Sequence, residues 1–245
     1  MKRLPASAEE ELLDRHDLAP AETARSLAEL DRVNRALFGW LPIQRALLPR
    51  LESGAPPARL LDLGTGSGEV AGKLARAAER GGAAVTLVGL DRKLAHLAIG
   101  RAMARRQGSA RRQLRVAGDA AALPFRDGAF AWSFSTLFFH HFDGEANRRI
   151  LAEMRRVTRA GAAVVDLRRS RLLLALVRLL LPLLGTGAVT RNDGRVSVHR
   201  AWTIAEVARL VEGEPVLELR RRFPFRFSLV MPGAGAASEP AGPRH

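Results

Sequence analysis

The chain has no cysteine and no tyrosine among its 245 residues. Without cysteine, neither a disulfide framework nor a thiolate metal site can form, and no metal site of another kind is predicted. Aromatic residues make up only 5%, which leaves few side chains on which nucleic-acid bases could stack. The glycine-rich loop at residues 64–68 also contains no lysine or arginine that could bind a phosphate.

Long apolar runs are scarce as well. Residues 172–184 (LLLALVRLLLPLL) come closest to the ~20 residues that span a bilayer, but Arg178 and Pro182 interrupt them. The first residues, MKRLPASAEEELL, contain no hydrophobic core of a signal peptide. We therefore expect a cytoplasmic protein without a transmembrane segment.

Positive charge is abundant and comes almost entirely from arginine. Lysine and arginine together number 39 against 25 acidic residues, which gives a formal net charge of +14. The arginines are spread along Ala/Leu-rich segments, whereas nucleic-acid binding favours one basic stripe with aromatic neighbours. The pattern disfavours a nucleic-acid partner and leaves open attraction to an acidic small molecule or peripheral contact with a membrane.

A glycine-rich segment at residues 59–70, RLLDLGTGSGEV, is the most informative part of the chain. An apolar run ends at Asp62, then Gly64, Gly66 and Gly68 alternate with small residues, and a helical pattern follows. This order predicts the strand, tight turn and helix that open a nucleotide-type binding fold. Glycines let a ligand lie against the backbone of such a turn. The motif alone also fits a dinucleotide-binding oxidoreductase, or a loop that is glycine-rich for packing.

Acidic residues follow the next two predicted strands. Residues 85–90 stop at Asp91, about 20 residues beyond the glycines, where dinucleotide folds place the carboxylate that binds ribose hydroxyls. Residues 115–118 lead to Asp119, and the small and apolar residues that begin with Ala120 suit the faces of an adenine. Because the loop lacks the cation of a phosphate-binding motif, the ligand is expected to carry hydroxyls and an ammonium group.

Together these residues resemble the class I S-adenosylmethionine-dependent methyltransferases, in particular the small-molecule enzymes of the ubiquinone and menaquinone type. The resemblance covers residues 59–232 and implies S-adenosylmethionine as the cofactor. It implies that Asp62 and the glycine turn face the methionine part, that Asp91 holds the ribose diol, and that Asp119 holds the adenine. The cofactor-binding residues implied in this way are Asp62, Gly64, Thr65, Gly66, Gly68, Asp91, Arg92, Asp119, Ala120 and Thr136.

Hydrophobic periodicity predicts an α/β fold, a doubly wound, Rossmann-like sheet of seven strands. Strands are expected at residues 59–62, 85–90, 115–117, 131–135, 162–167, 216–222 and 225–231. The resemblance implies that the last two close the sheet in antiparallel fashion. Helices are expected at residues 69–80, 93–107 and 145–157, with helical stripes at 27–37 and 43–51. Capping-box patterns at Ser7/Glu10 and Thr203/Glu206 predict two more helix starts.

The order of these elements divides the chain. The resemblance implies that residues 1–54 form an N-terminal helical lid and that residues 55–232 form the methyltransferase domain. Within that domain, residues 171–200 form an apolar cap insert after the fifth strand, while residues 233–245, rich in glycine and proline, are expected to be a disordered tail. The sequence is compatible with a monomer and with a homodimer.

The candidate chemistry lies after the fourth strand, in the segment STLFFHHFD. Methyl transfer from a sulfonium is a one-step displacement, which requires the nucleophile to be held close and water to be excluded. A hydroxyl acceptor also needs a base, and His141, then His140, are the candidates at the carboxyl end of this strand. Alternatively, both histidines line the pocket wall, and Asp143 caps the next helix.

The apolar insert bears on the acceptor. Its leucines could cover a lipophilic acceptor such as an aromatic polyketide, a quinone precursor or a phenolic lipid, or they could pack on the sheet or in a dimer. Asn34 and Arg35 are candidates for the cofactor's carboxylate. The candidate substrate contacts are Arg35, Phe139, Arg168, Arg200 and Trp202.

We therefore expect O-methylation of a small, hydrophobic or aromatic acceptor, with C-methylation second. One alternative is an RNA methyltransferase, although the segment after the fourth strand lacks the [DN]-P-P-[YFW] motif of enzymes that methylate base amines. Another alternative is a non-catalytic partner protein that binds S-adenosylmethionine.

Overall fold

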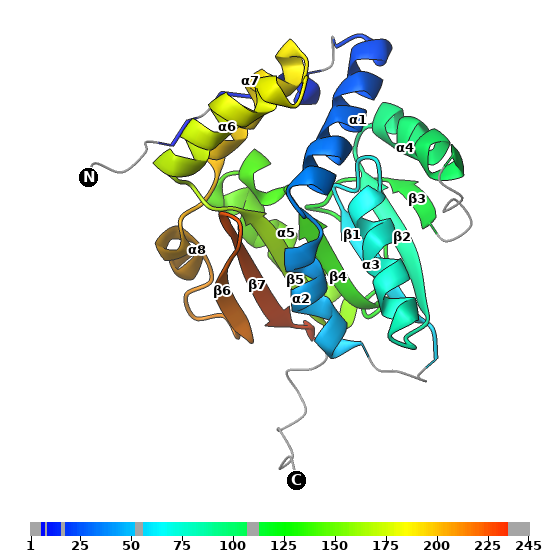
Figure 1. Cartoon of the computed structure of the whole chain (residues 1–245). Coiled ribbons are helices and arrows are strands. Elements are labelled where there is room, and N and C mark those ends of the chain that lie inside the picture. Colours follow the sequence, from blue (N-terminus) through cyan, green and yellow to red (C-terminus); the bar gives the residue numbers. More distant parts are fainter. Residues whose placement is uncertain (1–5, 8, 16–17, 52–55, 107–112, 235–245) are drawn as a thin grey trace.

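A seven-stranded sheet forms the centre of the molecule (Figure 1). The structure, a computed structural model, describes residues 6–7, 9–15, 18–51, 56–106 and 113–234. The strand order is β3-β2-β1-β4-β5-β7-β6. The strands are β1 (Ala58–Leu63), β2 (Val85–Asp91), β3 (Gln113–Ala117), β4 (Phe130–Thr136), β5 (Thr158–Leu167), β6 (Glu218–Arg222) and β7 (Arg226–Pro232).

The sheet has the predicted mixed topology. Strands β1 to β5 are parallel, whereas β7 pairs in antiparallel fashion with both β5 and β6. The order reverses between β1 and β4, and open α/β sheets bind ligands at the carboxyl ends of strands beside such a switch point. The prediction of a doubly wound, Rossmann-like sheet of seven strands is therefore confirmed.

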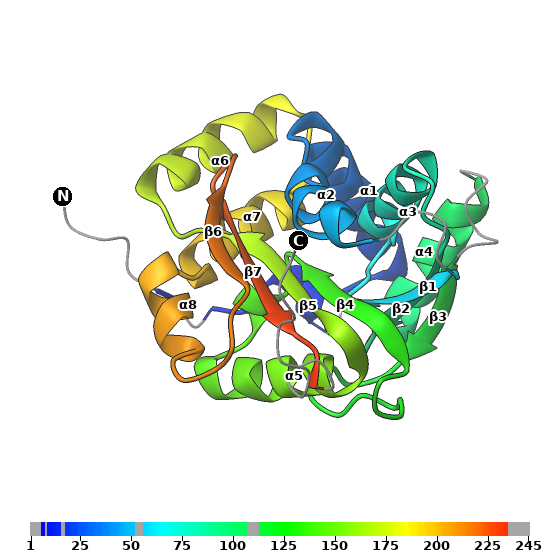
Figure 2. The same ribbon diagram turned by 90° about the horizontal axis from the view of Figure 1, so that it is seen from below.

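Helices cover both faces of the sheet and its carboxyl edge. The longer ones are α1 (Pro20–Ala36), α2 (Leu41–Leu47), α3 (Glu69–Arg80), α4 (Leu94–Arg106), α5 (Gly144–Arg156), α6 (Arg171–Leu183), α7 (Ala188–Arg200) and α8 (Ile204–Leu210). Short 3₁₀ turns are η1 (Leu12–Asp14), η2 (Leu48–Arg50) and η4 (Phe139–His141). Seen from below, α5 lies on one side of the sheet, and α2 and α3 lie on the other (Figure 2).

Two apolar cores hold these layers together. Leu60, Leu87 and Phe134 face α2 and α3, whereas Leu61 and Leu90 face α5 and α8. Successive residues of one strand thus point to opposite faces, and both faces of the central strands are buried. This explains why the central strands read as continuous apolar runs in the sequence. Helices α1, α6 and α7 remain outside these cores and lie over the carboxyl edge (Figure 1).

The first predicted helix is wrong. Among the described residues before Leu12 none is helical, and the Ser7 hydroxyl accepts a bond from the Glu9 amide at 3.1 Å without starting a helix. The amides of Leu12 and Leu13 instead donate to the carboxylate of Asp193 at 2.7 and 2.9 Å. A tertiary partner on α7 therefore takes the role that a local capping box would have played.

Helix α7 is a second departure, because residues 188–200 carry no local signal that predicts a helix. Gly187 precedes it without a side-chain cap, and the Glu29 carboxylate of α1 accepts bonds from the Gly187 amide and the Thr190 hydroxyl. Gly194 lies inside the helix because a Cβ there would come within 2.5 Å of Leu181 on α6. The predicted apolar insert is thus a hairpin of two helices.

Other local predictions hold. Helix α3 has its predicted bounds, and the capping box of Thr203 and Glu206 forms at the start of α8. The Asp143 carboxylate caps α5 by accepting a bond from the Ala146 amide at 2.8 Å. No helix among the described residues is long and apolar enough to cross a membrane. The predicted tail lies almost entirely outside the described residues, and the division into lid and domain stays a prediction.

Candidate active site

The glycine turn between β1 and α3 has the backbone shape that requires glycine. Gly64, Gly66 and Gly68 all have positive φ values, of 67°, 49° and 77°. At Gly64 an added Cβ would lie 2.2 Å from the ring of Phe138, so no other residue fits there without a shift. Arg115 on β3 holds the turn from behind by donating to the carbonyl groups of Gly66 and Ser67 at 3.1 and 2.7 Å.

Asp62, at the end of β1, is a buried carboxyl group. It accepts a hydrogen bond from the Thr65 hydroxyl at 2.7 Å. Burial raises its pKa to about 7, although the Thr65 bond and the charge of Arg115 act in the opposite direction. A carboxyl group in this state can accept a bond from an ammonium group that enters the cavity beside it.

Asp91, at the end of β2, is held as a carboxylate. Its oxygens accept bonds from the amides of Gly66 and Lys93 at 3.1 and 2.9 Å, and His96 Nδ1 lies 3.6 Å away. Burial raises its pKa, but the bonds from His96 and from the two amides outweigh burial, so the pKa lies below its usual value. An ionised, fixed carboxylate suits a pair of ribose hydroxyls, which need acceptors.

These residues open onto a cavity of about 1030 Å³. That volume lies at the upper end of ligand pockets, which span roughly 300–1,000 Å³, so it can hold a cofactor and an acceptor together. Of the predicted cofactor residues, all but Gly68 line it: Asp62, Gly64, Thr65, Gly66, Asp91, Arg92, Asp119, Ala120 and Thr136. These groups fit S-adenosylmethionine, because hydroxyl and amino groups meet acceptors here and the glycine backbone leaves room.

The opposite wall of the cavity is apolar. Helix α1 contributes Leu27, Leu30 and Val33, and α6 contributes Leu173, Leu176, Val177 and Leu180. Half of the leucine-rich insert therefore faces the cavity, as the sequence suggested. The other side of α6 exposes Leu172, Leu179 and Leu183.

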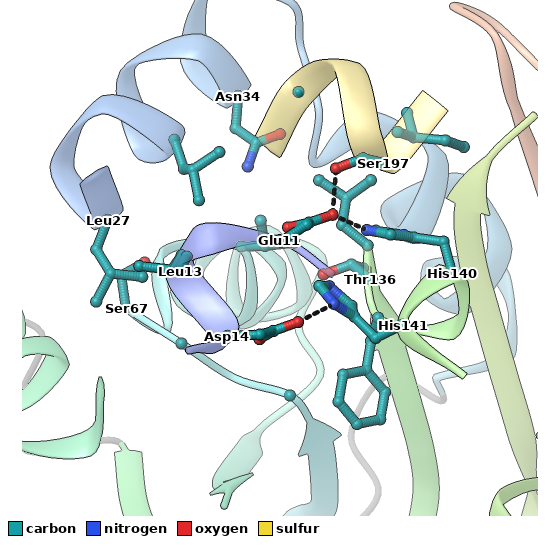
Figure 3. A pocket seen from close by; sticks show the side chains of 18 of the residues that line it. Glu11, Leu13, Asp14, Leu27, Asn34, Ser67, Thr136, His140, His141 and Ser197 are labelled. Carbon is teal, nitrogen blue, oxygen red and sulfur yellow. Dashed lines mark hydrogen bonds and ion pairs between the residues drawn. The ribbon is translucent and has the colours of Figure 1, made fainter. Parts of the chain in front are cut away.

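His141 forms a pair with a carboxylate that the sequence did not reveal. Its Nδ1 lies 2.6 Å from Asp14 Oδ2, and both side chains line the cavity (Figure 3). Burial raises the pKa of Asp14, but its bond to His141 outweighs burial, so the pKa falls to about 2. An ionised Asp14 can accept a hydrogen bond from Nδ1–H of His141, and in that tautomer of the neutral imidazole Nε2 carries the lone pair.

His140 has different surroundings. Its Nδ1 lies 2.7 Å from Asp166. Its Nε2 lies 3.2 Å from Glu11 (Figure 3). Burial lowers its pKa, but the two carboxylates outweigh burial and raise it to about 10. Both ring nitrogens then donate, so His140 has no lone pair for a proton. Ligand atoms of Glu11, His140 and His141 also lie within 4.8 Å of one another, but a His140 that holds a proton on each nitrogen has no lone pair with which to bind a metal ion.

Arg200 is the one predicted substrate contact that lines the cavity. Its guanidinium donates to the carbonyl groups of His140 and His141 at 2.8 and 2.5 Å and to that of Glu9 at 3.0 Å. These bonds join α7, η4 and the N-terminal segment. Arg200 therefore holds the two histidines in place through their backbone.

The other predicted substrate contacts do not line this cavity. Arg35 pairs with Glu69 at 2.8 Å, and Phe139 is buried in the core. Trp202 donates to the carbonyl of Phe139 at 3.4 Å, and the amide of Arg168 bonds to the loop before β7. None of these side chains is brought together with the histidine pair, and their roles as substrate contacts stay predictions.

Comparisons with known proteins agree with this geometry. Residues 60–161 match a family model described as a methyltransferase domain. A SAM-dependent methyltransferase from Aquifex aeolicus aligns with 17% identity and a TM-score of 0.59, over 87% of this chain and 98% of that one. A structure of SAM-dependent methyltransferases from Methanosarcina mazei aligns with 18% identity and a TM-score of 0.53, over 73% of this chain and 93% of that one.

A third structure similar to this chain contains a small aromatic ligand. It is an O-methyltransferase family 2 protein from Planctomyces limnophilus in complex with apigenin, with 16% identity and a TM-score of 0.62 over 89% of this chain and 63% of that one. At these identities the likeness shows a shared fold. A search of curated proteins finds no match to the chain.

Proposed function

We propose that the chain is a class I S-adenosylmethionine-dependent methyltransferase and that it methylates a hydroxyl group of a small, largely apolar acceptor. The match of residues 60–161 to a methyltransferase domain and the fold shared with solved methyltransferases support the first part. The pair of His141 and Asp14 on the cavity wall carries this proposal. Methylation of a neutral hydroxyl releases a proton, and this pair offers a base to take it.

The residues of the chain divide the work of the reaction. When bound, S-adenosylmethionine supplies a methyl group on a positively charged sulfur, which leaves as a neutral thioether. Asp62, the glycine turn and Asp91 would hold the donor, and the leucines of α1 and α6 would hold the acceptor and exclude water. His141 Nε2 would take the hydroxyl proton while Asp14 stabilises the imidazolium formed.

The apolar wall supports the choice of acceptor class. The leucines and valines of α1 and α6 offer a continuous apolar surface in a cavity whose other elements contribute mostly polar groups, and an aromatic or lipophilic body can cover that surface. The complex of the Planctomyces neighbour with apigenin is consistent with a hydroxylated aromatic acceptor. C-methylation of an activated aromatic carbon would need the same wall but a weaker base.

The test is a panel of hydroxylated aromatic and lipophilic acceptors, their O-methyl ethers, and a structured RNA, with product detected by mass spectrometry. The native chain is expected to methylate free hydroxyls only. His141→Gln should lower kcat by about 10²–10⁴, the usual contribution of a general base, and leave the affinity for S-adenosylhomocysteine unchanged in calorimetry. Asp14→Asn should lower kcat less and shift the pH profile. Full activity of His141→Gln would show that His141 is not the general base.

A further inference from the structure

Arg226 is a buried cation that the proposed chemistry does not use. It begins β7, where it pairs with Leu167 at the carboxyl end of β5, and its side chain lines the cavity. Only 5% of the residue is exposed, and its Nη1 has no hydrogen-bond partner in the part of the chain that the structure describes. Burial lowers its pKa to about 10. Arg226 therefore stays charged at neutral pH, in a site that offers it little solvent.

The nearest carboxylate does not neutralise this charge. Asp166 on β5 raises the pKa of Arg226 through its field, but its oxygens are already used. Asp166 Oδ1 pairs with His140 Nδ1 at 2.7 Å, and Oδ2 accepts the amides of Phe138 and His140 at 3.0 and 3.1 Å. No ion pair joins Arg226 to any acid among the residues described. A buried charge without a close counter-ion costs several kcal/mol, which a bound anion would offset.

A neutral partner fixes the position of the guanidinium. Arg226 Nη2 donates to Asn34 Oδ1 of α1 at 3.3 Å. The backbone of Gly39 comes so close that an added Cβ would lie 2.3 Å from Asn34 Oδ1 and 3.1 Å from Arg226 Nη2. Asn34 therefore orients the guanidinium without neutralising it, and Gly39 leaves both side chains the space they need.

We propose that Arg226 forms a carboxylate-binding subsite of the cavity, and that the acceptor is an amphipathic carboxylic acid. This assignment deepens the proposed function and rests on it. A planar guanidinium matches the two oxygens of a carboxylate. With the carboxylate at Arg226, the apolar body of the acceptor would lie along α1 and α6, and a hydroxyl further along would face His141.

Two ligands could bring a carboxylate to this place, the acceptor and the methionine part of the cofactor. The strand order assigns it to the acceptor. Strands β4 and β5 separate β7 from the glycine turn after β1, and neighbouring strands lie about 4.8 Å apart. The backbone of Arg226 thus lies about 14 Å from β1, the strand that carries the donor site. It lies on the far side of β5 from that strand, where we place the acceptor.

Calorimetry on the full chain saturated with S-adenosylhomocysteine tests the subsite without turnover. Decanoate and methyl decanoate serve as the charged and neutral probes. The native chain is expected to bind decanoate more tightly than the ester. Arg226→Met should lower the affinity for decanoate at least tenfold and change the affinity for methyl decanoate less than twofold. Arg221→Met, which removes an exposed arginine of the neighbouring strand, should leave both affinities unchanged.

The outcomes separate the alternatives. Equal binding of decanoate by the native chain and by Arg226→Met would overturn the subsite. A loss of affinity for S-adenosylhomocysteine alone would overturn the acceptor assignment, because the cofactor's carboxylate would then be the ligand. Arg226→Lys keeps the charge without the planar fork and should give an intermediate affinity, so the proposal stays testable if the Met variant does not fold. Acid binding without methylation of any hydroxyl would contradict the proposed function only.

Discussion

Adjacent histidines with opposite properties show how single side chains shape this site. His140 lies between Asp166 and Glu11 and holds a proton on each nitrogen, whereas His141 meets one carboxylate, Asp14. His140 organises the loop after β4 through these two carboxylates. His141 is the residue that we propose as the base.

Asp62 carries a prediction about pH. Its pKa is raised to about 7 by burial, so the folded state favours the protonated form, and the contribution to stability that is present below pH 4 is lost as the pH rises through 7. Asp62→Asn cannot ionise and should therefore be more stable than the native chain at pH 8, by about 2–4 kcal/mol, and equal to it near pH 4. Its affinity for S-adenosylmethionine should fall.

Thermal unfolding of both proteins between pH 4 and pH 8 measures this difference. Asp119→Asn, which changes an exposed carboxylate of the same cavity, is the matched control and should follow the native curve. An Asp62→Asn variant that is less stable at pH 8 than the native chain would show that the carboxylate stabilises the fold.

The sequence identifies site residues where local order determines their position. Asp62 and Asp91 could be predicted because each ends a buried strand, and the carboxyl ends of parallel strands meet at one edge. Asp14 could not, because it is 127 positions from His141 and belongs to a 3₁₀ turn. Arg226 looks like any other arginine of a basic chain until the fold buries it.

At the scale of elements, η1 and α7 depend on each other. The carboxylate of Asp193 accepts the amides of Leu12 and Leu13, and Lys93 donates to the carbonyl of Leu13 at 2.6 Å. These contacts bring Asp14 to His141. They explain why the pair of His141 and Asp14 depends on a segment that carries little of the apolar core.

Asp193→Ala should therefore damage activity more than stability. Without the carboxylate, two amides lose their acceptor and η1 is released, so kcat should fall about tenfold or more, and amide exchange over residues 9–15 should become faster. The melting temperature should change by only a few degrees, because both apolar cores stay intact. Arg191→Ala, on the exposed side of α7, is the control. Unchanged exchange at residues 9–15 would contradict the dependence.

Element prediction succeeds and fails for the same physical reason. Helix α8 has its own capping box, and α3 has a glycine turn before it and Gly81 after it, so their bounds could be predicted. Helix α7 lacks a local cap, and its start is stabilised by Glu29 of α1. Signals that lie within a few residues are visible in the sequence, whereas caps supplied from a distant helix are not.

At the scale of the whole molecule, the cavity is built from parts that are distant in the chain. Its walls come from η1 and α1, from the carboxyl ends of β1, β2 and β4, and from α6 and α7. Helices α1 and α7 contact each other, as do α1 and α4. A ligand that fills the cavity touches all of these elements at once, so binding energy is coupled to the folding of the entire chain.

S-adenosylhomocysteine at 100 times its Kd should therefore stabilise the native chain by about 2.7 kcal/mol, a rise in melting temperature of roughly 5–10 °C for a chain of this size. Asp91→Ala removes the carboxylate that the ribose would use and should abolish the rise, whereas Arg226→Met should keep it, since Arg226 is assigned to the acceptor. Differential scanning fluorimetry over a titration with S-adenosylhomocysteine measures the rise in melting temperature for the native chain and both variants. A full shift in Asp91→Ala would show that the ribose binds elsewhere. Among the described residues, Asp91 is the only charged group at the end of β2 that accepts a bond from the Gly66 amide.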